Sequence, residues 1–226
     1  DAIVAHGVKA ASWFMNLATV KGRFDISGAE IAGQFNANNK AVFENPNGDA
    51  IQAHSVKAAG WYMNNATVKG RFYINSAEIA GQFDADSATF ENPSGTAIAA
   101  YYSVFRGGFF VRGDTRVVGD IDLTAASIEK ALVLTGSTFH ASRHRAVSLR
   151  EARIAGDTSF EGSTVRGHIF ASRARFEGRV SLRGDFDLRA STLARQRGDL
   201  QAELGEALTA TDKERQERFR HHALVL

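Results

Sequence analysis

The chain of 226 residues contains no cysteine, which excludes disulfide bonds, thiolate metal sites and a cysteine nucleophile. It contains only two prolines, so no proline-rich linker divides it. No apolar run approaches the roughly 18–20 residues of a membrane-spanning helix, and no signal peptide is visible. These absences leave the compartment open, and we favour the cytoplasm. Because residue 1 is Asp rather than Met, we expect a processed product or a fragment.

The net charge of the chain is also small. The net charge of +2 is too low to predict binding to nucleic acid or to an anionic membrane. Hydrophobic residues make up 44% of the chain and charged residues 23%, a balance typical of a folded protein. The 21 glycines suit many tight turns.

A 48-residue repeat runs through the first half of the chain. Residues 18–35, ATVKGRFDISGAEIAGQF, return 48 positions later as ATVKGRFYINSAEIAGQF at residues 66–83. Two weaker copies follow, over residues 117–139 and from about residue 146 to residue 193. Self-similarity at a fixed period is typical of solenoid proteins, in which each repeat stacks on the next.

A shorter, 11-residue period lies inside the long one, as in Ala66-x-Val68, Ala77-x-Ile79 and Ala88-x-Phe90. These units are too short for helices and are bounded by Gly, Asn or Ser, which indicates short strands. A small residue precedes each large one by two positions, so both side chains point inward. The predicted inward residues of the first repeat are Val20, Phe24, Ile26, Ile31, Phe35 and Phe43. The aromatic repeat mates Trp13 and Trp61, and Phe14 and Tyr62, and the pair Met15 and Met63, are likewise predicted to pack rather than to bind a ligand.

Two of these 11- or 12-residue units, 22–24 residues in all, make one four-sided coil, so each 48-residue repeat makes two coils. The predicted fold is an all-β solenoid, a four-sided parallel β-helix of about eight coils over residues 1–195. At ~4.8 Å per coil its length is roughly 38 Å. The segments Asn45-Pro46-Asn47-Gly48 and Asn92-Pro93-Ser94-Gly95 are predicted to form equivalent β-turns on one corner.

Residues 196–226 lose the strand pattern, and we expect a C-terminal helical cap. Leu200, Leu204 and Leu208 form an apolar helical stripe, and Thr211 with Glu214 forms a capping box. A cap covers the open strand edges of a final coil.

The Ala-x-Ile/Val-x-Gly-x-Phe units resemble relaxed pentapeptide-repeat sequences, although their 11- or 12-residue spacing departs from a strict pentapeptide period. The recurring FENPxGxAIxA segment is similar to one in pentapeptide-repeat-like bacterial proteins with 48-residue repeats, which are sometimes labelled membrane-associated oxidoreductases. The resemblance covers about residues 1–193. It implies a four-sided β-helix and carries over no catalytic residues. No dinucleotide or phosphate-loop fingerprint supports the oxidoreductase label.

No catalytic, cofactor-binding or metal-binding residue is predicted. His6 and His54 are repeat mates two coils apart, ~9.6 Å, which is too far for one metal ion. Two Asp-x-Asp pairs, Asp120 with Asp122 and Asp185 with Asp187, could form a paired-carboxylate site. We prefer a solvated outer face for both pairs.

Charge is distributed unevenly along the chain, with a net charge of −2 over residues 1–100 and +4 over residues 101–226. The basic residues of the second part are nearly all arginine, which suits bidentate contacts with carboxylates or phosphates. Two interpretations remain open, a solvated surface with ion pairs between coils and a face that binds an anion or an acidic partner. The residues of that possible face are Arg143, Arg145, Arg150, Arg166, Arg173, Arg175 and Arg179.

The favoured hypothesis for function is a non-enzymatic scaffold for protein interaction or self-assembly, leaning away from an enzyme. The alternatives are a polysaccharide-active enzyme on a β-helix and a nucleic-acid mimic that binds a target protein, and the net charge of +2 speaks against the mimic. We expect association through the N-terminal coil, where Ile3 and Val8 would lie at an uncovered edge, either with a protein partner or with a second copy. No nucleic acid is expected to bind.

Overall fold

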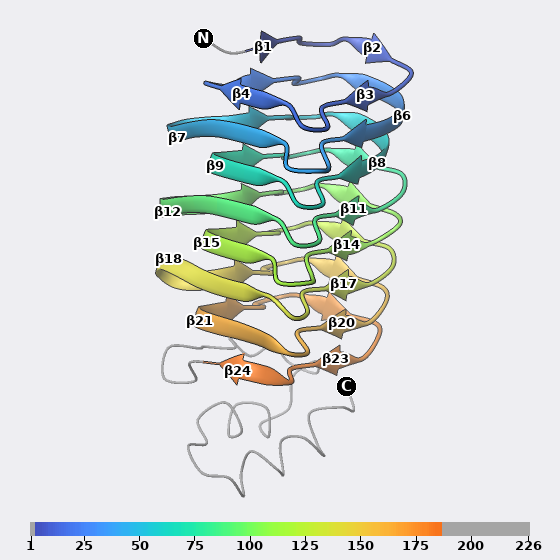
Figure 1. Ribbon diagram of the computed structural model, residues 1–226. Coiled ribbons are helices and arrows are strands. Elements are labelled where there is room, and N and C mark those ends of the chain that lie inside the picture. The colour runs from blue at the N-terminus through green and yellow to red at the C-terminus, as the bar shows by residue number, and fades with distance from the viewer. Residues whose placement is uncertain (1–2, 187–226) are drawn as a thin grey trace, which may run out of the picture.

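The computed structural model describes residues 3–186, apart from the side chains of residues 142–144. These residues wind into one parallel β-helix of about eight coils, as predicted (Figure 1). The predicted helical cap lies outside the described residues. None of the residues from 3 to 186 forms a helix that could span a membrane.

Two sheets make the four faces of the solenoid, because the long strands of each sheet bend around a corner and contribute to two faces. All pairings between neighbouring coils are parallel. The first sheet contains β1 (Ile3–Val4), β4 (Thr19–Lys21), β5 (Phe24–Asp25), β7 (Val42–Gln52), β9 (Thr67–Tyr73), β12 (Thr89–Ala99), β15 (Arg116–Asp122), β18 (Thr138–Ser148), β21 (Ser163–Phe170) and β24 (Gly184–Phe186).

The strands of the second sheet are shorter, and most of them are two residues long. It contains β2 (Lys9–Ala10), β3 (Trp13–Phe14), β6 (Glu30–Asn36), β8 (Lys57–Tyr62), β10 (Glu78–Ile79), β11 (Phe83–Asp84), β13 (Val104–Phe105), β14 (Phe109–Phe110), β16 (Ser127–Ile128), β17 (Leu132–Val133), β19 (Arg153–Ile154), β20 (Thr158–Ser159), β22 (Arg175–Phe176) and β23 (Val180–Ser181).

The core is a set of columns in which one inward residue per face stacks on its equivalent in the next coil. Phe24 pairs with Ile51, and Ile51 pairs with Phe72. Aromatic rings stack in the same way: the Phe35 and Trp61 centroids are 4.0 Å apart. The predicted inward residues are all buried, which confirms the two-residue period: Val20, Phe24, Ile26, Ile31, Phe35 and Phe43.

The coils alternate between a long and a short form, and the predicted length of 22–24 residues per coil is wrong for the long coils. The stacking partner of Phe24 is Ile51, 27 positions further along the chain, whereas the partner of Ile51 is Phe72, only 21 positions further. The pair of coils keeps the 48-residue period. The extra residues of each long coil lie in the 11-residue strands β7, β12 and β18, which project on the left of Figure 1.

Each projection is a bulge, and in β7 and β12 it contains the Asn-Pro-x-Gly segment. In β7 the ladder is interrupted between Glu44 and Asp49, and the Asn45 side-chain amide donates to the Asp49 carbonyl at 2.9 Å. In β12 the Asn92 amide donates equally to the Thr96 carbonyl at 2.8 Å. Both strands pair with β9, so the predicted equivalence of the two segments is confirmed.

The bulge explains the glycine of the VKGRF unit. Gly70 has φ +114°, and a Cβ at this position would collide with the Asn45 carbonyl oxygen of the bulge above it. Gly119 has φ +117°, and a Cβ at this position would likewise lie only 2.6 Å from the Asn92 carbonyl oxygen. Glycine is required here by both backbone conformation and space.

The aromatic repeat mates differ in burial. Trp61 and Met63 are fully buried, as predicted, but Phe14 is 66% exposed. The prediction that Phe14 packs in the core is therefore wrong. Phe14 follows the inward residue Trp13 and points out of the coil, as its mate Tyr62 does after Trp61.

Removing one stacked ring tests the core columns. Phe72 is fully buried and stacks on Phe83 and Phe90, so Phe72→Ala is expected to lower the free energy of unfolding by about 3–5 kcal/mol. Chemical unfolding followed by circular dichroism measures the change, with Tyr102→Ala as a control at a 69% exposed position. A Phe72→Ala protein that unfolds at the wild-type midpoint would contradict the inward assignment.

The contact between glycine and bulge gives a second test. Gly70→Ala is expected to destabilise the fold by about 1–3 kcal/mol, since the alanine would adopt a strained φ and displace the bulge. Gly95→Ala is the matched control, because its Cβ would meet only the Asn92 side chain at 3.5 Å. Equal melting temperatures for the two variants would disprove the proposed role of Gly70.

Candidate interaction surface

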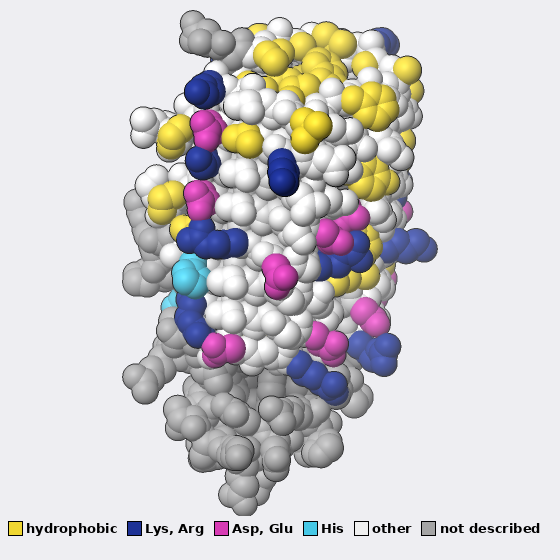
Figure 2. Space-filling model, in the orientation of Figure 1, with side chains coloured by type: hydrophobic (Ala, Val, Ile, Leu, Met, Phe, Trp, Pro, Cys, Tyr) yellow, Lys and Arg dark blue, Asp and Glu magenta, His cyan; other side chains and the backbone are white. Residues whose placement is uncertain are grey.

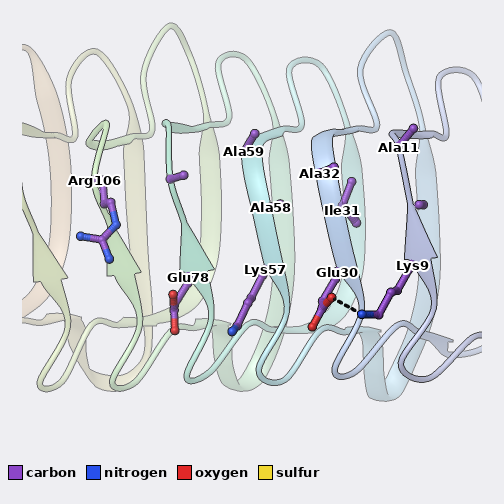
Figure 3. Close-up of a pocket in the computed structure, with 12 residues that line it drawn as sticks. Lys9, Ala11, Glu30, Ile31, Ala32, Lys57, Ala58, Ala59, Glu78 and Arg106 are labelled. Atoms are coloured by element: carbon purple, nitrogen blue, oxygen red, sulfur yellow. Dashed lines mark ion pairs between the residues drawn. The ribbon is translucent and has the colours of Figure 1, made fainter.

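One face of the second sheet carries a shallow, open groove of about 600 Å³ (Figure 3). We call this the groove face; it is formed by β2, the start of β6, β8, β10, β13, β16, β19 and β22, each with the residue or residues that follow it. Alanines form the floor of the groove, and charged side chains stand along one side of it. The floor is Ala11, Ala32, Ala59 and Ala80, and the charged side chains are Lys9, Glu30, Lys57, Glu78 and, at the end, Arg106.

The groove follows directly from the strand pattern. In each coil the central residue, such as Ala58 or Ile79, points inward, and the residues on either side of it point outward. Parallel in-register pairing places Lys57 between Glu30 and Glu78, so the outward residues form rows along the solenoid. Successive members of a row are ~4.8 Å apart.

The charges of the groove face alternate in sign from coil to coil. Three neighbouring pairs form ion pairs: Lys9 with Glu30 at 2.9 Å, Arg106 with Glu129 at 2.8 Å, and Arg153 with Glu177 at 2.8 Å. The hydrogen bond that Lys9 donates lowers the pKa of Glu30, and the hydrogen bond that Arg153 donates to Glu177 raises the pKa of Arg153. In the middle of the face, Lys57 and Glu78 make no ion pair with any residue that the structure describes.

A second polar cluster lies on the adjoining face, around the acidic pair Asp84 and Asp86. The Arg112 guanidinium contacts Asp86 at 2.7 Å and Asp84 at 3.3 Å, and it lies 4.8 Å from the Phe110 ring centroid. Gln82 donates to Asp84 at 3.1 Å. Burial, followed by the negative charge of Asp86, raises the pKa of Asp84 to about 6.

This cluster lies at the end of a ladder of side-chain amides at the same corner. Each side-chain oxygen of the ladder accepts a hydrogen bond from a backbone N–H of the next coil, at 2.7–2.9 Å. The Asn38 N–H donates to Asn16, the Asn64 N–H donates to Asn38, and the Asp86 N–H donates to Asn64. The sequence analysis did not identify the acidic pair, although its Asp-x-Asp spacing equals that of the pairs it considered.

The prediction that Asp120 and Asp122 lie on a solvated outer face is wrong. Both are more than nine-tenths buried, and the Arg145 guanidinium contacts Asp122 at 2.9 Å and Asp120 at 3.7 Å. Thr124 donates to Asp122 through its backbone N–H and its hydroxyl. Asp185 is exposed and pairs with Arg166 at 2.5 Å, whereas Asp187 lies outside the described residues.

Most of the arginines predicted to form an anion-binding face are engaged with carboxylates of neighbouring coils. Arg173 pairs with Glu151 at 3.4 Å and Arg179 with Asp157 at 3.2 Å, in addition to the pairs of Arg145 and Arg166. Arg150 and Arg175 are exposed, and the side chain of Arg143 lies outside the described residues. The arginines lie on strands of both sheets and at corners, and an acidic partner for them stays a prediction.

The histidines do not converge either. His6 pairs with the buried Asp25 at 2.9 Å, and His54 lies against Tyr73. Across the described part of the chain, no three His, Cys, Asp or Glu side chains are grouped so that they could hold a metal ion.

The raised pKa of Asp84 predicts an unusual pH dependence. The folded state binds the Asp84 proton more tightly than the unfolded state, so this group stabilises the fold at low pH, and that stability is lost as the pH rises from about 4 to about 6. Asp84→Asn is therefore expected to raise the free energy of unfolding at pH 8 by about 1–3 kcal/mol, with a smaller difference at pH 4. Urea unfolding at several pH values measures it.

Asp157 is the matched control, because hydrogen bonds from the Arg179 backbone and side chain lower its pKa. Asp157→Asn should lose stability at pH 8, with the loss shrinking as the pH falls. An Asp84→Asn protein less stable than the wild type at pH 8 would show that the charged form of Asp84 is stabilised by Arg112 more than burial destabilises it.

The comparisons with known proteins agree with the coil geometry. A family model for pentapeptide repeats, in nine copies, matches residues 144–184. No curated protein and no solved structure matches the chain. The matched segment contains β19 to β23, which repeat the stacked columns and four faces of the preceding coils. The chain is therefore a β-solenoid of which residues 144–184 match the pentapeptide-repeat family.

Proposed function

We propose that this chain is a non-enzymatic scaffold that associates with a second copy through the open edge of its first coil. The observation that carries the proposal is the distribution of exposed apolar side chains. Six large hydrophobic residues are exposed in the described part of the chain, and all but Tyr102 lie between residues 3 and 17. The five in the first coil are Ile3, Val4, Val8, Phe14 and Leu17. Figure 2 shows hydrophobic side chains gathered at this end of the solenoid.

The backbone of the first coil is open in the same place. Among the described residues, β1 pairs only with β5, and β2 and β3 pair only with β6. The other edge of these strands presents N–H and C=O groups without a neighbouring strand from the described part of the chain, which is a template for pairing with another chain. Apolar side chains and strand edges that pair with no described residue therefore coincide on one surface.

A second copy fits this edge by symmetry. Two first coils that meet head to head are related by a two-fold axis, so the same residues occur on both sides and the contact is closed. Strands that meet in this way run antiparallel, and antiparallel pairs are slightly more stable per residue than parallel ones. The contact would bury the exposed Ile3 and Val4.

The observations give less support to the alternatives. A polysaccharide-active enzyme needs two accessible carboxylates on either side of a bond. The most strongly buried acidic pair, Asp120 and Asp122, is instead held by Arg145. A nucleic-acid mimic needs a strongly negative surface, and the net charge is +2.

Light scattering at tens of micromolar protein tests the proposal, and the expected mass exceeds that of the 24.5 kDa monomer. Val4→Lys places a charge on the open edge at a side chain that is 57% exposed, so it should lower the mass below that of the wild type. Ile3→Lys should act in the same way. Tyr102→Lys, at a 69% exposed position far from the edge, should change nothing. If the wild type is a monomer and none of the variants differs from it, the proposal is wrong.

A further inference from the structure

The groove face has a charge pattern that is complementary to itself. From the first coil to the seventh, the charged residue next to the inward residue alternates in sign, and the eighth coil carries one charge of each sign. In coil order they are Lys9, Glu30, Lys57, Glu78, Arg106, Glu129, Arg153 and, on the last coil, Arg175 with Glu177. Because the number of coils is even, an antiparallel copy presents the opposite charge at every position from the second coil to the seventh, whereas Lys9 of the first coil meets both Arg175 and Glu177 of the eighth. We infer that the groove face binds the groove face of a second, antiparallel copy, an interaction separate from that of the first coil.

Alternation alone would not carry this inference, since it also stabilises neighbouring coils within one molecule. The first sheet shows such a case, visible as alternating basic and acidic side chains down the left of Figure 2, where Lys69 pairs with Glu44 at 2.7 Å. The groove face differs at its centre. There Lys57 and Glu78 are adjacent, but neither makes an ion pair with a described residue, so both can bind a partner.

The shape of the groove face also favours the antiparallel arrangement. In coils three and four the charged residues precede the inward residue, and Ala59 and Ala80 follow it. In coils five and six this order is reversed: Val104 and Ser127 precede, and long side chains follow. Those long side chains are Arg106 and Glu129.

A two-fold axis lying in the interface, perpendicular to the solenoid, places each row against the same row of the other copy. The fourth coil then faces the partner's fifth coil, and the third coil faces its sixth. Arg106 of one copy would lie over Ala80 of the other, beside Glu78, and Glu129 would lie over Ala59, beside Lys57. Long side chains would thus fill the alanine groove, and each central charge would gain an opposite neighbour.

The size of the face predicts a weak, reversible dimer. Eight coils at ~4.8 Å and strand segments of about four residues give a contact of roughly 500 Å² per copy, near the lower limit for specific interfaces. Exposed charges at such a contact set orientation and register more than affinity. Salt should weaken the dimer, because the screening length falls from ~10 Å at 0.1 M to ~3 Å at 1 M.

Charge reversal with mixing tests the inference. Glu78→Lys alone would place a second cation beside Arg106 of the other copy, and Arg106→Glu alone would place a second carboxylate beside Glu78. Each variant is expected to weaken this association about tenfold or more in low salt, measured by sedimentation velocity. In an equimolar mixture, a pair made of one copy of each variant again has opposite charges facing each other across the contact, so the mixture should associate within about threefold of the wild type. Circular dichroism checks that each variant is folded, and Lys57→Glu mixed with Glu129→Lys is a second, independent pair.

Glu161→Lys is the control, since Glu161 is an exposed charge at another corner, between β20 and β21. It should leave the association unchanged. If Arg106→Glu associates as the wild type does, or if the mixture fails to recover, the inference is wrong. If Val4→Lys abolishes association and all four charge variants leave it intact, this inference is wrong and the first-coil contact is supported. If the charge variants abolish association and Val4→Lys leaves it intact, the first-coil contact is wrong and this inference is supported.

Discussion

The structure depends on one constraint: on each face, one inward residue must stack on its equivalent in the next coil, ~4.8 Å away. This fixes the inner perimeter of every coil, because a longer path would break the columns that bury Phe24, Ile51 and Phe72. Additional residues can only leave the perimeter as a bulge. The bulges of β7, β12 and β18 do so at one place, and Gly70 makes room for the first of them.

The same constraint organises the outer surface. Once inward residues stack in register, outward residues form rows too, and charges placed one per coil become ladders. The rows of the groove face and the Asn16–Asn38–Asn64 ladder are consequences of this stacking. The first coil pairs on one side only among the described residues, as the last described coil does, but exposed apolar side chains gather at the first. The surfaces that we propose for association are thus properties of the repeat rather than of isolated residues.

The sequence predicted the fold class, the coil number and the inward residues, because each inward column repeats the same residue types at a regular spacing. It did not predict unequal coils, since the 48-residue period reports only the sum of a long and a short coil. Burial of Asp120 and Asp122 was missed for a similar reason: Arg145, which covers them, comes from the next coil. The groove face was not visible because its alanines and charges converge only after the coils stack.

The most direct test of this account measures the stacking itself. The chain has no cysteine, so Glu30→Cys and Arg153→Cys can carry two spin labels on one row of the groove face, five coils apart. Pulsed electron paramagnetic resonance, with labelled protein diluted into unlabelled protein, then reports the distance within one molecule. Parallel coils in register predict a narrow distribution near roughly 24 Å, at ~4.8 Å per coil, broadened only by the label linkers. A broad distribution, or one centred beyond about 40 Å, would contradict the stacked β-helix.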